Sequence, residues 1–296
     1  MGFGEALRSK DFVVTAHVNL SRAPDTDALL QQGEDLREFV DAVQVTDNPG
    51  AEVHMSGVAA AALLARQGVD PVLHMTCRDR NRIALQSDLI GAVALGVGSI
   101  LVMRGDRIPE RMKPKVRSVF DTDAKELMAF ARGLKDSQDV SLVADLLIGA
   151  TATVFDPESG WAPVNLAAKC DAGANFIQTQ LCFDMDVVRN YMAQLVAAKL
   201  THRASFLMAL TPLPSAEAAR WIKDNVKAAL VPPPVIARME QAADPEREGI
   251  EICAEMLAEL ATIPGVSGAS LLPLGRLDAI PAAIGASGVR SPGGAT

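Results

Sequence analysis

Residues 72–103 read VLHMTCRDRNRIALQSDLIGAVALGVGSILVM and contain one complete strand–helix–strand unit. The first six residues form a short, mostly apolar run that is typical of a strand buried on both faces. From 81 to 95, apolar residues such as Ile83 and Leu89 recur at the spacing of an amphipathic helix. Residues 99–103 form a second apolar run. Because parallel neighbouring strands need a helical crossover, this stretch predicts a βαβ unit.

The same alternation recurs along the rest of the chain. The predicted strands cover residues 12–18, 43–46, 72–77, 99–103, 140–148, 175–180, 204–210 and 266–272. The predicted helices cover residues 25–39, 53–66, 81–95, 123–134, 164–170, 185–200, 215–226, 245–261 and 276–284. Eight strand–helix repeats at roughly 30-residue spacing predict an α/β fold of the (β/α)8, or TIM-barrel, type.

The chain is expected to form one domain. No linker divides residues 1–285, which we assign to the barrel, and the Gly-, Ser- and Pro-rich residues 286–296 are expected to form a flexible tail. The alternative is a doubly wound open sheet, which is disfavoured because no GxGxxG motif follows the first strand. Gly96 and Gly98 lack the third glycine of that motif and precede a strand, not a helix.

Composition excludes several functional classes. Hydrophobic residues make up 49% and charged residues 22% of the 296 residues, which is typical of a globular protein. The net charge of −8 argues against nucleic-acid binding. No two of the 4 cysteines have CxxC spacing, so reduced thiols are expected. Because the chain has neither a signal-like N-terminus nor an apolar run of membrane-spanning length, we expect a cytoplasmic protein without a membrane contact.

In a barrel, chemistry gathers where the strands end and their following loops begin. The end of the third strand, residues 74–81, is unusually polar. Thr76, Arg78 and Asn81 could donate hydrogen bonds to a phosphate or a polar ring there. The alternative is structural: His74 would be a hydrogen-bonded core histidine, and the residues after it a solvated helix start.

Two further strand ends carry candidate ligand-binding groups. Asp106 follows Gly105 at the end of the fourth strand, where a carboxylate could bind a ring N–H or balance charge on a cofactor. The alternative is a turn or helix-cap aspartate. Thr179 and Gln180 end the sixth strand, and an amide can donate and accept at once, as recognition of an amide-like heterocycle requires. The alternative for Gln180 is a hydrogen bond inside the barrel.

His17 ends the first strand. Histidines titrate near neutral pH and serve as general acids or bases, although a lone histidine is more often structural. No His, Asp or Glu triplet has metal-ligand spacing, so we expect no metal site. No GxSxG motif is present. Metal-dependent hydrolysis and serine hydrolysis therefore rank low.

Taken together, these segments resemble the methylenetetrahydrofolate reductase family. The strongest block is HMTCRDRNRIALQ at 74–86, which continues through LIGA at 89–92 and ILVMRGD at 100–106. A second block is KCDAGAN at 169–175, followed by Thr179-Gln180 and then by Phe183-Asp184. The general resemblance extends over most of residues 12–275. It implies a (β/α)8 barrel, in agreement with the strand count.

The resemblance also implies a function. The family reduces 5,10-methylenetetrahydrofolate to 5-methyltetrahydrofolate, usually with bound FAD and a nicotinamide donor, NAD(P)H. By motif, Asp106 would sit between the flavin and the folate, and Gln180, with Thr179 beside it, would bind the pterin. The residues that would line the flavin site are His74, Thr76, Arg104, Gly105, Asn165 and Lys169. Outer barrel helices commonly self-associate, so a homo-oligomer is compatible with the sequence.

Three positions depart from the family pattern. His17 stands where the family's opening motif has a glutamate that assists proton transfer, so His17 would take the acid role as an imidazolium. Residues 149–155, GATATVF, replace a Pro-Glu-x-His element that often follows the fifth strand. Ala162 stands where an acidic cofactor-binding residue is often found. The last two departures weaken the expectation of ordinary FAD binding.

Three hypotheses therefore stay open at the level of sequence. The first is a flavin-dependent folate reductase with His17 in the acid role. The second is a reductase that passes hydride directly from NAD(P)H to the folate. The third is a folate-binding or methyl-transfer accessory protein that has lost reduction. No Rossmann discriminator is present, so the residues favour neither NADH nor NADPH. Reduction and the reverse oxidation both stay open as the physiological direction.

Overall fold

The computed structural model describes residues 2–113, 115–136 and 146–290. Eight parallel strands form a closed barrel in chain order, and β1 closes the sheet by pairing with β8 from Val13↔Gly268 to Ala16↔Leu271. The strands are β1 Val13–His17, β2 Ala42–Val45, β3 Pro71–Thr76, β4 Ser99–Met103, β5 Leu147–Ala152, β6 Phe176–Leu181, β7 Ser205–Leu210 and β8 Val266–Leu271. The predicted TIM barrel is confirmed.

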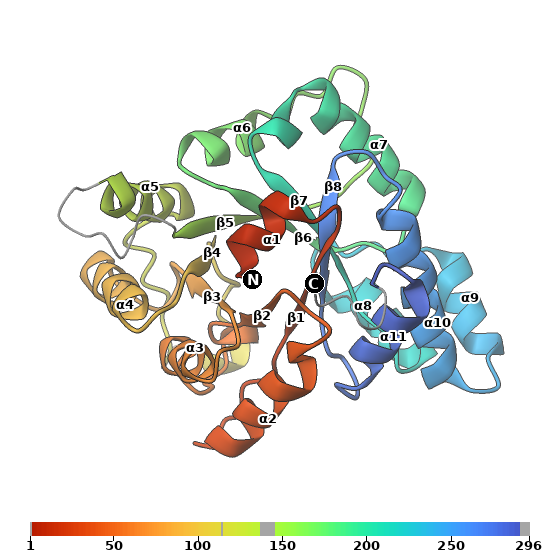
Figure 1. The fold of residues 1–296 in the computed structure, drawn as a ribbon, viewed down its shortest axis with the longest axis horizontal. Coiled ribbons are helices and arrows are strands. Elements are labelled where there is room, and N and C mark those ends of the chain that lie inside the picture. Colours follow the sequence, from red (N-terminus) through yellow and green to blue (C-terminus); the bar gives the residue numbers. More distant parts are fainter. Residues whose placement is uncertain (1, 114, 137–145, 291–296) are drawn as a thin grey trace.

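The strands are surrounded by a ring of helices (Figure 1). These are α2 Thr26–Arg37, α3 Gly57–Arg66, α4 Arg82–Ala94, α5 Ala124–Asp136, α6 Val164–Asp171, α7 Met185–Ala197, α8 Ala216–Asn225, α9 Pro233–Gln241, α10 Pro245–Leu260 and α11 Ala279–Ser287. Several begin at residues whose side chains accept a backbone N–H of the first turn, including Asn81 for α4 and Asp244 for α10. Such caps satisfy donors that a helix cannot pair internally.

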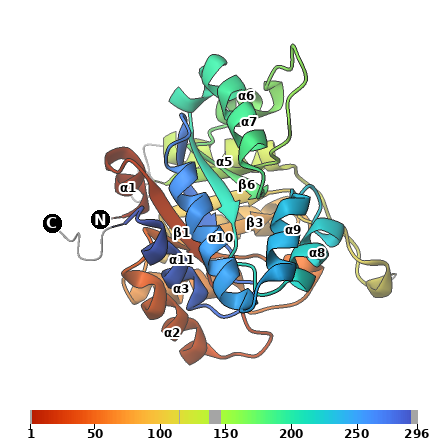
Figure 2. The ribbon, with the colours of Figure 1, turned by 90° about the vertical axis from the view of Figure 1, so that its right-hand side faces the viewer.

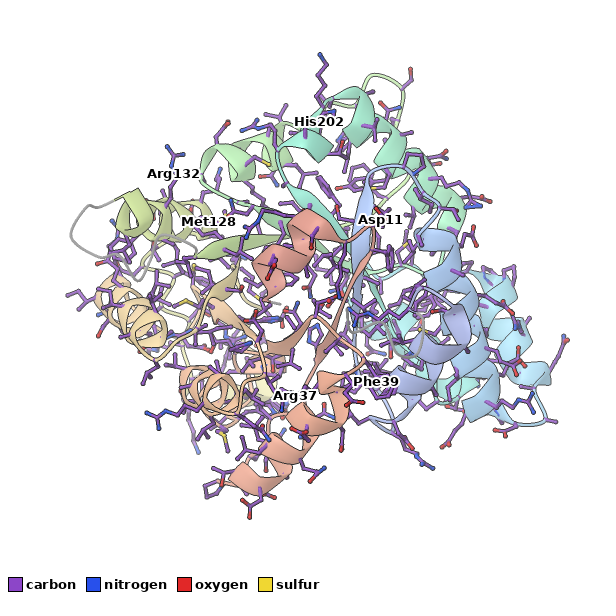
Figure 3. The ribbon with its side chains drawn as sticks, in the orientation of Figure 1. Asp11, Arg37, Phe39, Met128, Arg132 and His202 are labelled. Carbon is purple, nitrogen blue, oxygen red and sulfur yellow. The ribbon has the colours of Figure 1, made fainter. Side chains whose placement is uncertain are left out.

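A further helix, α1 (Phe3–Ser9), covers the end of the barrel where the strands begin (Figures 1 and 2). Phe3 is fully buried and meets the Phe176 ring edge-on, with ring centroids 5.3 Å apart. The Phe3 backbone N–H donates to Asp70 Oδ2 at 2.6 Å. Asp11 and Phe39, in loops that lead into strands, are exposed in the same region (Figure 3). The covering helix leaves the opposite end of the barrel for ligands.

The structure corrects the prediction for the fifth strand. Strand β5 covers Leu147–Ala152, whereas we expected residues 140–148, of which 140–145 lie outside the described residues. Gly149 and two threonines gave the segment a loop-like composition. Gly149 is required because a Cβ there would lie 2.2 Å from the Phe176 ring. Close packing inside the barrel, not strand propensity, therefore decides this position.

Smaller differences concern the helices. The sequence prediction missed α1 and α9, and α9 begins at a pair of prolines that resemble a loop. Helix α3 begins at Gly57 and not at residue 53, because a short 3-10 turn, Pro49–Ala51, precedes it. The last helix, α11, runs to Ser287, past the predicted end at 284. No helix among the described residues is long and apolar enough to cross a membrane.

The barrel interior changes from apolar to polar along its axis. Near the beginnings of the strands, α1 covers a buried cluster that includes Val13, Val72, Leu101 and Leu207. Toward their ends, the buried side chains include Gln44, His74, Gln178 and Ser270. Because an apolar filling suffices to hold a barrel closed, the buried polar groups need a separate explanation.

Candidate functional site

His17, at the end of β1, lies within a buried polar cluster. Its Nε2 atom is 3.2 Å from Ser270 Oγ on β8 and 3.3 Å from the amide nitrogen of Gln178 on β6. His17 is 7% exposed, Gln178 is 5% exposed and Ser270 is fully buried. Three strands distant in the sequence therefore place polar groups around one imidazole.

A second chain of hydrogen bonds lies beside the first. His74 Nε2 on β3 is 2.8 Å from Gln44 Oε1 on β2, and Gln44 Nε2 donates to Thr15 Oγ1 at 3.1 Å. The His74 and His17 rings meet edge-on, with centroids 5.3 Å apart. His74 is thus a hydrogen-bonded core residue, which was the structural alternative for it.

Burial keeps both imidazoles neutral. It lowers the pKa of His17 to about 4. Burial, and secondarily the neighbouring His17, lowers the pKa of His74 well below its usual value. Since the imidazolium form of His17 is scarce at neutral pH, neutral His17 is suited to hydrogen bonding, and its proposed acid role stays a prediction.

The polar stretch after β3 is held by ion pairs. Asp47 Oδ2 accepts the backbone N–H of Thr76 at 2.8 Å and its hydroxyl at 3.0 Å, and Asp47 also pairs with Arg80. The Arg78 guanidinium is 1% exposed and binds both carboxylate oxygens of Asp79, at 2.6 and 2.7 Å. The structure therefore favours internal scaffolding over anion binding for Arg78.

Asp106 lies just beyond β4 and is exposed. Gly105 before it has φ +89°, and a Cβ there would lie 2.9 Å from Arg78 Cβ and 3.1 Å from Thr76 Cβ. Only glycine adopts this conformation without strain, and its missing side chain lets the β4 loop contact the end of β3. The exposed Arg104 guanidinium stacks on the Phe120 ring, 4.5 Å from its centroid. Asp106 is thus carried by a tightly packed turn.

The two predicted substrate residues of β6 differ. Thr179 is buried, and its hydroxyl accepts the Ala209 N–H of β7 at 3.0 Å, where the β6–β7 register shifts. The Thr179 hydroxyl is therefore already used within the sheet. Gln180 is half-buried, and its Oε1 accepts the Leu181 N–H at 3.0 Å, so its amide nitrogen is left for another partner. Substrate binding by either residue stays a prediction.

The residues expected around a flavin do not all face one open surface. His74 and Thr76 are buried and hydrogen-bonded to Gln44 and Asp47. The Lys169 ammonium donates to the Thr151 carbonyl at 2.5 Å, and burial, followed by nearby Lys125, lowers the pKa of Lys169. Among the six, only Arg104, Gly105 and Asn165 are left without a buried polar partner. These six residues therefore do not form a complete polar cradle for FAD.

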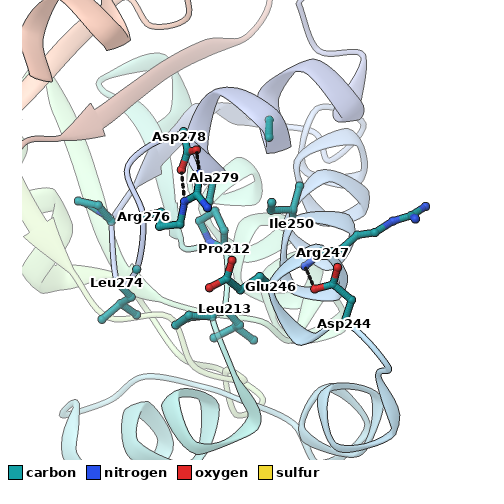
Figure 4. Close-up of a pocket in the computed structure, with 14 residues that line it drawn as sticks. Pro212, Leu213, Asp244, Glu246, Arg247, Ile250, Leu274, Arg276, Asp278 and Ala279 are labelled. Carbon is teal, nitrogen blue, oxygen red and sulfur yellow. Dashed lines mark hydrogen bonds and ion pairs between the residues drawn. The ribbon is translucent and has the colours of Figure 1, made fainter.

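Loops after β7 and β8 enclose a cavity of about 290 Å³ (Figure 4). Its walls combine the apolar Leu213, Ile250 and Leu274 with charged groups from the start of α10 and the β8 loop. Arg276 pairs with Asp278 at its edge, as the dashed lines in Figure 4 show. In a barrel, these loops lie at the same end as the other strand ends.

Sequence reasoning missed this cavity and the buried Gln44, Gln178 and Ser270. The cavity is assembled from loops whose residues carry no motif. Gln178 could have been suspected, because a glutamine is unusual within the predicted strand 175–180. Among the described residues, no group of His, Cys, Asp or Glu is arranged to hold a metal ion.

Comparisons with known proteins agree with this picture. The chain is 30% identical over 141 residues to a "Probable methylenetetrahydrofolate reductase (NADPH)" of Caenorhabditis elegans, a match that covers 48% of this chain and 20% of that protein. The chain thus spans a minor part of that relative's length. EDTA monooxygenase from Chelativorans sp. BNC1 has a similar fold, with TM-score 0.56, 11% identity and 95% of each chain covered.

A sequence profile of the family described as methylenetetrahydrofolate reductase matches residues 3–288. This match includes all eight strands, with Gln180 on β6, and the loop after β4 that carries Asp106. The chain therefore belongs to the methylenetetrahydrofolate reductase family.

Proposed function

We propose that the protein reduces 5,10-methylenetetrahydrofolate to 5-methyltetrahydrofolate, or catalyses the reverse oxidation, with NAD(P)H or its oxidised form as the hydride partner. The proposal rests on the polar groups at the mouth of the barrel, which is the end where the strands finish. There the exposed carboxylate of Asp106 follows β4, and the half-buried amide of Gln180 lies near the end of β6, at the same end of the barrel. Family membership supplies the reaction class.

The chemistry asks two things of the protein. The five-membered ring of the substrate must open by protonation of one ring nitrogen, which leaves an iminium cation on the other. Hydride from NAD(P)H then adds to the methylene carbon, so one proton and one hydride convert the methylene group into a methyl group. Asp106 is suited to stabilise the cationic iminium by its negative charge, because opposite charges attract strongly in a partly desolvated site.

Gln180 would hold the pterin edge during this step. Its amide nitrogen can donate to a ring carbonyl or ring nitrogen. The cavity between the β7 and β8 loops would receive the aminobenzoyl end, whose ring suits the apolar wall. Together these residues would orient the methylene carbon toward the nicotinamide.

The direct test measures NAD(P)H oxidation with and without methylenetetrahydrofolate, using the purified protein. We expect oxidation that depends on the folate. A visible spectrum of the same sample separates a flavin-dependent from a flavin-independent route, because bound flavin absorbs visible light. Given the incomplete flavin cradle, we expect turnover without added FAD and without flavin absorbance.

The second candidate is a folate-binding or methyl-transfer protein without reductase activity. It is favoured by one observation: neutral His17 stands where the family has its acid, and burial lowers the pKa of His17 to about 4. Binding of methylenetetrahydrofolate with no NAD(P)H oxidation at any pH between 5 and 8 would select this candidate.

A further inference from the structure

Gln178 carries a buried hydrogen-bonding atom that has no partner. Its Oε1 is shielded from solvent and meets no donor within the described residues. The amide nitrogen of the same side chain is 3.3 Å from His17 Nε2. Burying a polar atom without a partner is unfavourable, so native proteins rarely keep one without a ligand, an ordered water or a functional reason.

The neighbouring Gln44 provides a contrast within the same barrel. It is also buried, but Oε1 of Gln44 is 2.8 Å from His74 Nε2, and its Nε2 donates to Thr15 Oγ1. Both ends of that amide are therefore used inside the protein. Gln178 has the same chemistry in the same interior and leaves one end free. Gln44 is therefore a structural glutamine, whereas Gln178 keeps an acceptor oxygen that a ligand could use.

Rotating the Gln178 amide by half a turn does not remove the problem. The oxygen could then accept from a protonated His17 Nε2, but the amide nitrogen would be the group without a partner. With Gln178 donating to His17 Nε2, the proton of the neutral imidazole lies on Nδ1. Gln178 then presents an acceptor beside an imidazole that is exposed by 7%.

We propose that Gln178 is a ligand-binding residue at the floor of the barrel mouth, and that its Oε1 accepts a hydrogen bond from an N–H group of the reduced pteridine ring. This inference rests on the proposed function, because it takes folate as the ligand. Gln178 lies two positions before Gln180 on β6. The two amides would then contact one ring from a single strand, Gln178 by accepting and Gln180 by donating.

The test compares Gln178→Leu with Gln44→Leu. Leucine keeps most of the side-chain volume and removes the polar atoms. In Gln178→Leu the unpartnered oxygen disappears, so we expect an unchanged or raised melting temperature of the ligand-free protein. In Gln44→Leu the donors and acceptors of His74 and Thr15 lose their partner, so we expect a melting temperature several degrees lower.

Affinity is measured by calorimetry with 5-methyltetrahydrofolate. We expect the dissociation constant of Gln178→Leu to rise at least about tenfold, as for loss of one hydrogen bond to a ligand. An unchanged dissociation constant would overturn the proposal, whatever the melting temperature. If Gln178→Leu lowers both stability and affinity, a second variant, Gln178→Glu, is measured, because glutamate retains an acceptor oxygen. Near-normal folate affinity of Gln178→Glu supports the proposal. A loss of affinity as large as that of Gln178→Leu contradicts it.

Two controls separate this inference from the proposed function. If the wild-type protein does not bind the folate, the proposed function itself is refuted. If the wild-type protein and Gln178→Leu bind the folate equally tightly, only the role of Gln178 is refuted. A parallel titration with FAD identifies the ring, because a flavin also carries an N–H. Loss of FAD affinity with folate affinity retained would overturn the pteridine assignment.

Discussion

At the scale of single residues, exposed and buried polar groups at the mouth of the barrel differ in what they can do. Asp106 is exposed and can approach a bound ring, whereas His17 is buried among Gln178, Ser270 and His74. We therefore propose that the Asp106 carboxylate is the group that stabilises positive charge in a ligand. The buried histidine pair is better suited to fix the shape of the floor.

Asp106→Asn should slow turnover without unfolding the protein. The change removes the negative charge but keeps the size of the side chain, so we expect kcat to fall by about 100-fold or more. Because Asp106 is exposed, the free energy of unfolding should change by less than about 0.5 kcal/mol. Steady-state kinetics and urea unfolding measure the two effects. A wild-type kcat would remove Asp106 from the mechanism.

Gln180→Ala should weaken folate binding by about 1–3 kcal/mol, because polar groups of the pterin would lose their partner on binding. Calorimetric titration of the folate measures this change. Gln194→Ala, an exposed glutamine on the outer helix α7, is the matched control and should bind normally. Equal affinities for the two variants would dismiss the assignment of Gln180.

The positions of two candidate site residues could be inferred from chain order alone. Asp106 follows β4 and Gln180 lies near the end of β6, so both were expected where the strands end. The hydrogen bonds of His17 could not, because Gln178 and Ser270 reach it from β6 and β8, which are far away in the sequence. The low pKa of His17 has the same origin, since burial depends on the closed barrel.

At the scale of elements, the strands were predictable because a strand covered by helices is apolar along its whole length. Strand β5 was misplaced because the ring of Phe176 demands Gly149, a residue that weakens any strand pattern. Helix α1 was missed because it has only seven residues and is stabilised by packing under the barrel. Such contacts between distant segments leave little trace in local sequence.

Gly249→Ala tests how closely α10 packs on the β7 loop. A Cβ at Gly249 would lie 1.8 Å from the Leu213 carbonyl oxygen, so the helix would have to move. We expect the free energy of unfolding to drop by about 3 kcal/mol. Gly91→Ala on α4 is the control: no atom lies within 4 Å of its added Cβ, and alanine favours helix, so stability should stay equal or rise. Urea unfolding of both variants makes the comparison, and equal losses would contradict it.

At the scale of the whole molecule, α1 covers one end of a closed barrel while polar groups occupy the other. The interior is thus apolar at one end and polar at the other. The polar end makes the fold sensitive to acid, because the folded state holds two histidines in the neutral form. Unfolding exposes both of them to water and to protons.

Stability should therefore fall as the pH drops from 6.5 toward 4. The unfolded chain takes up protons at His17 and His74 near pH 6.5, whereas burial keeps the pKa of His17 at about 4 in the folded state. For His17 alone, the loss across this window is about 3 kcal/mol. Urea unfolding at several pH values measures it. His17→Gln should flatten the slope, and an unchanged slope would show that His17 contributes nothing to it.

The distribution of the cysteines has a practical consequence for labelling. Cys77, Cys182 and Cys253 are buried, and burial raises the pKa of their thiols to about 11, 11 and 12. Cys170 is the one half-buried thiol, and partial burial raises its pKa too. A maleimide dye should therefore attach to Cys170 first. Placed on α6, it would provide a fluorescent reporter on the native chain without any engineered cysteine.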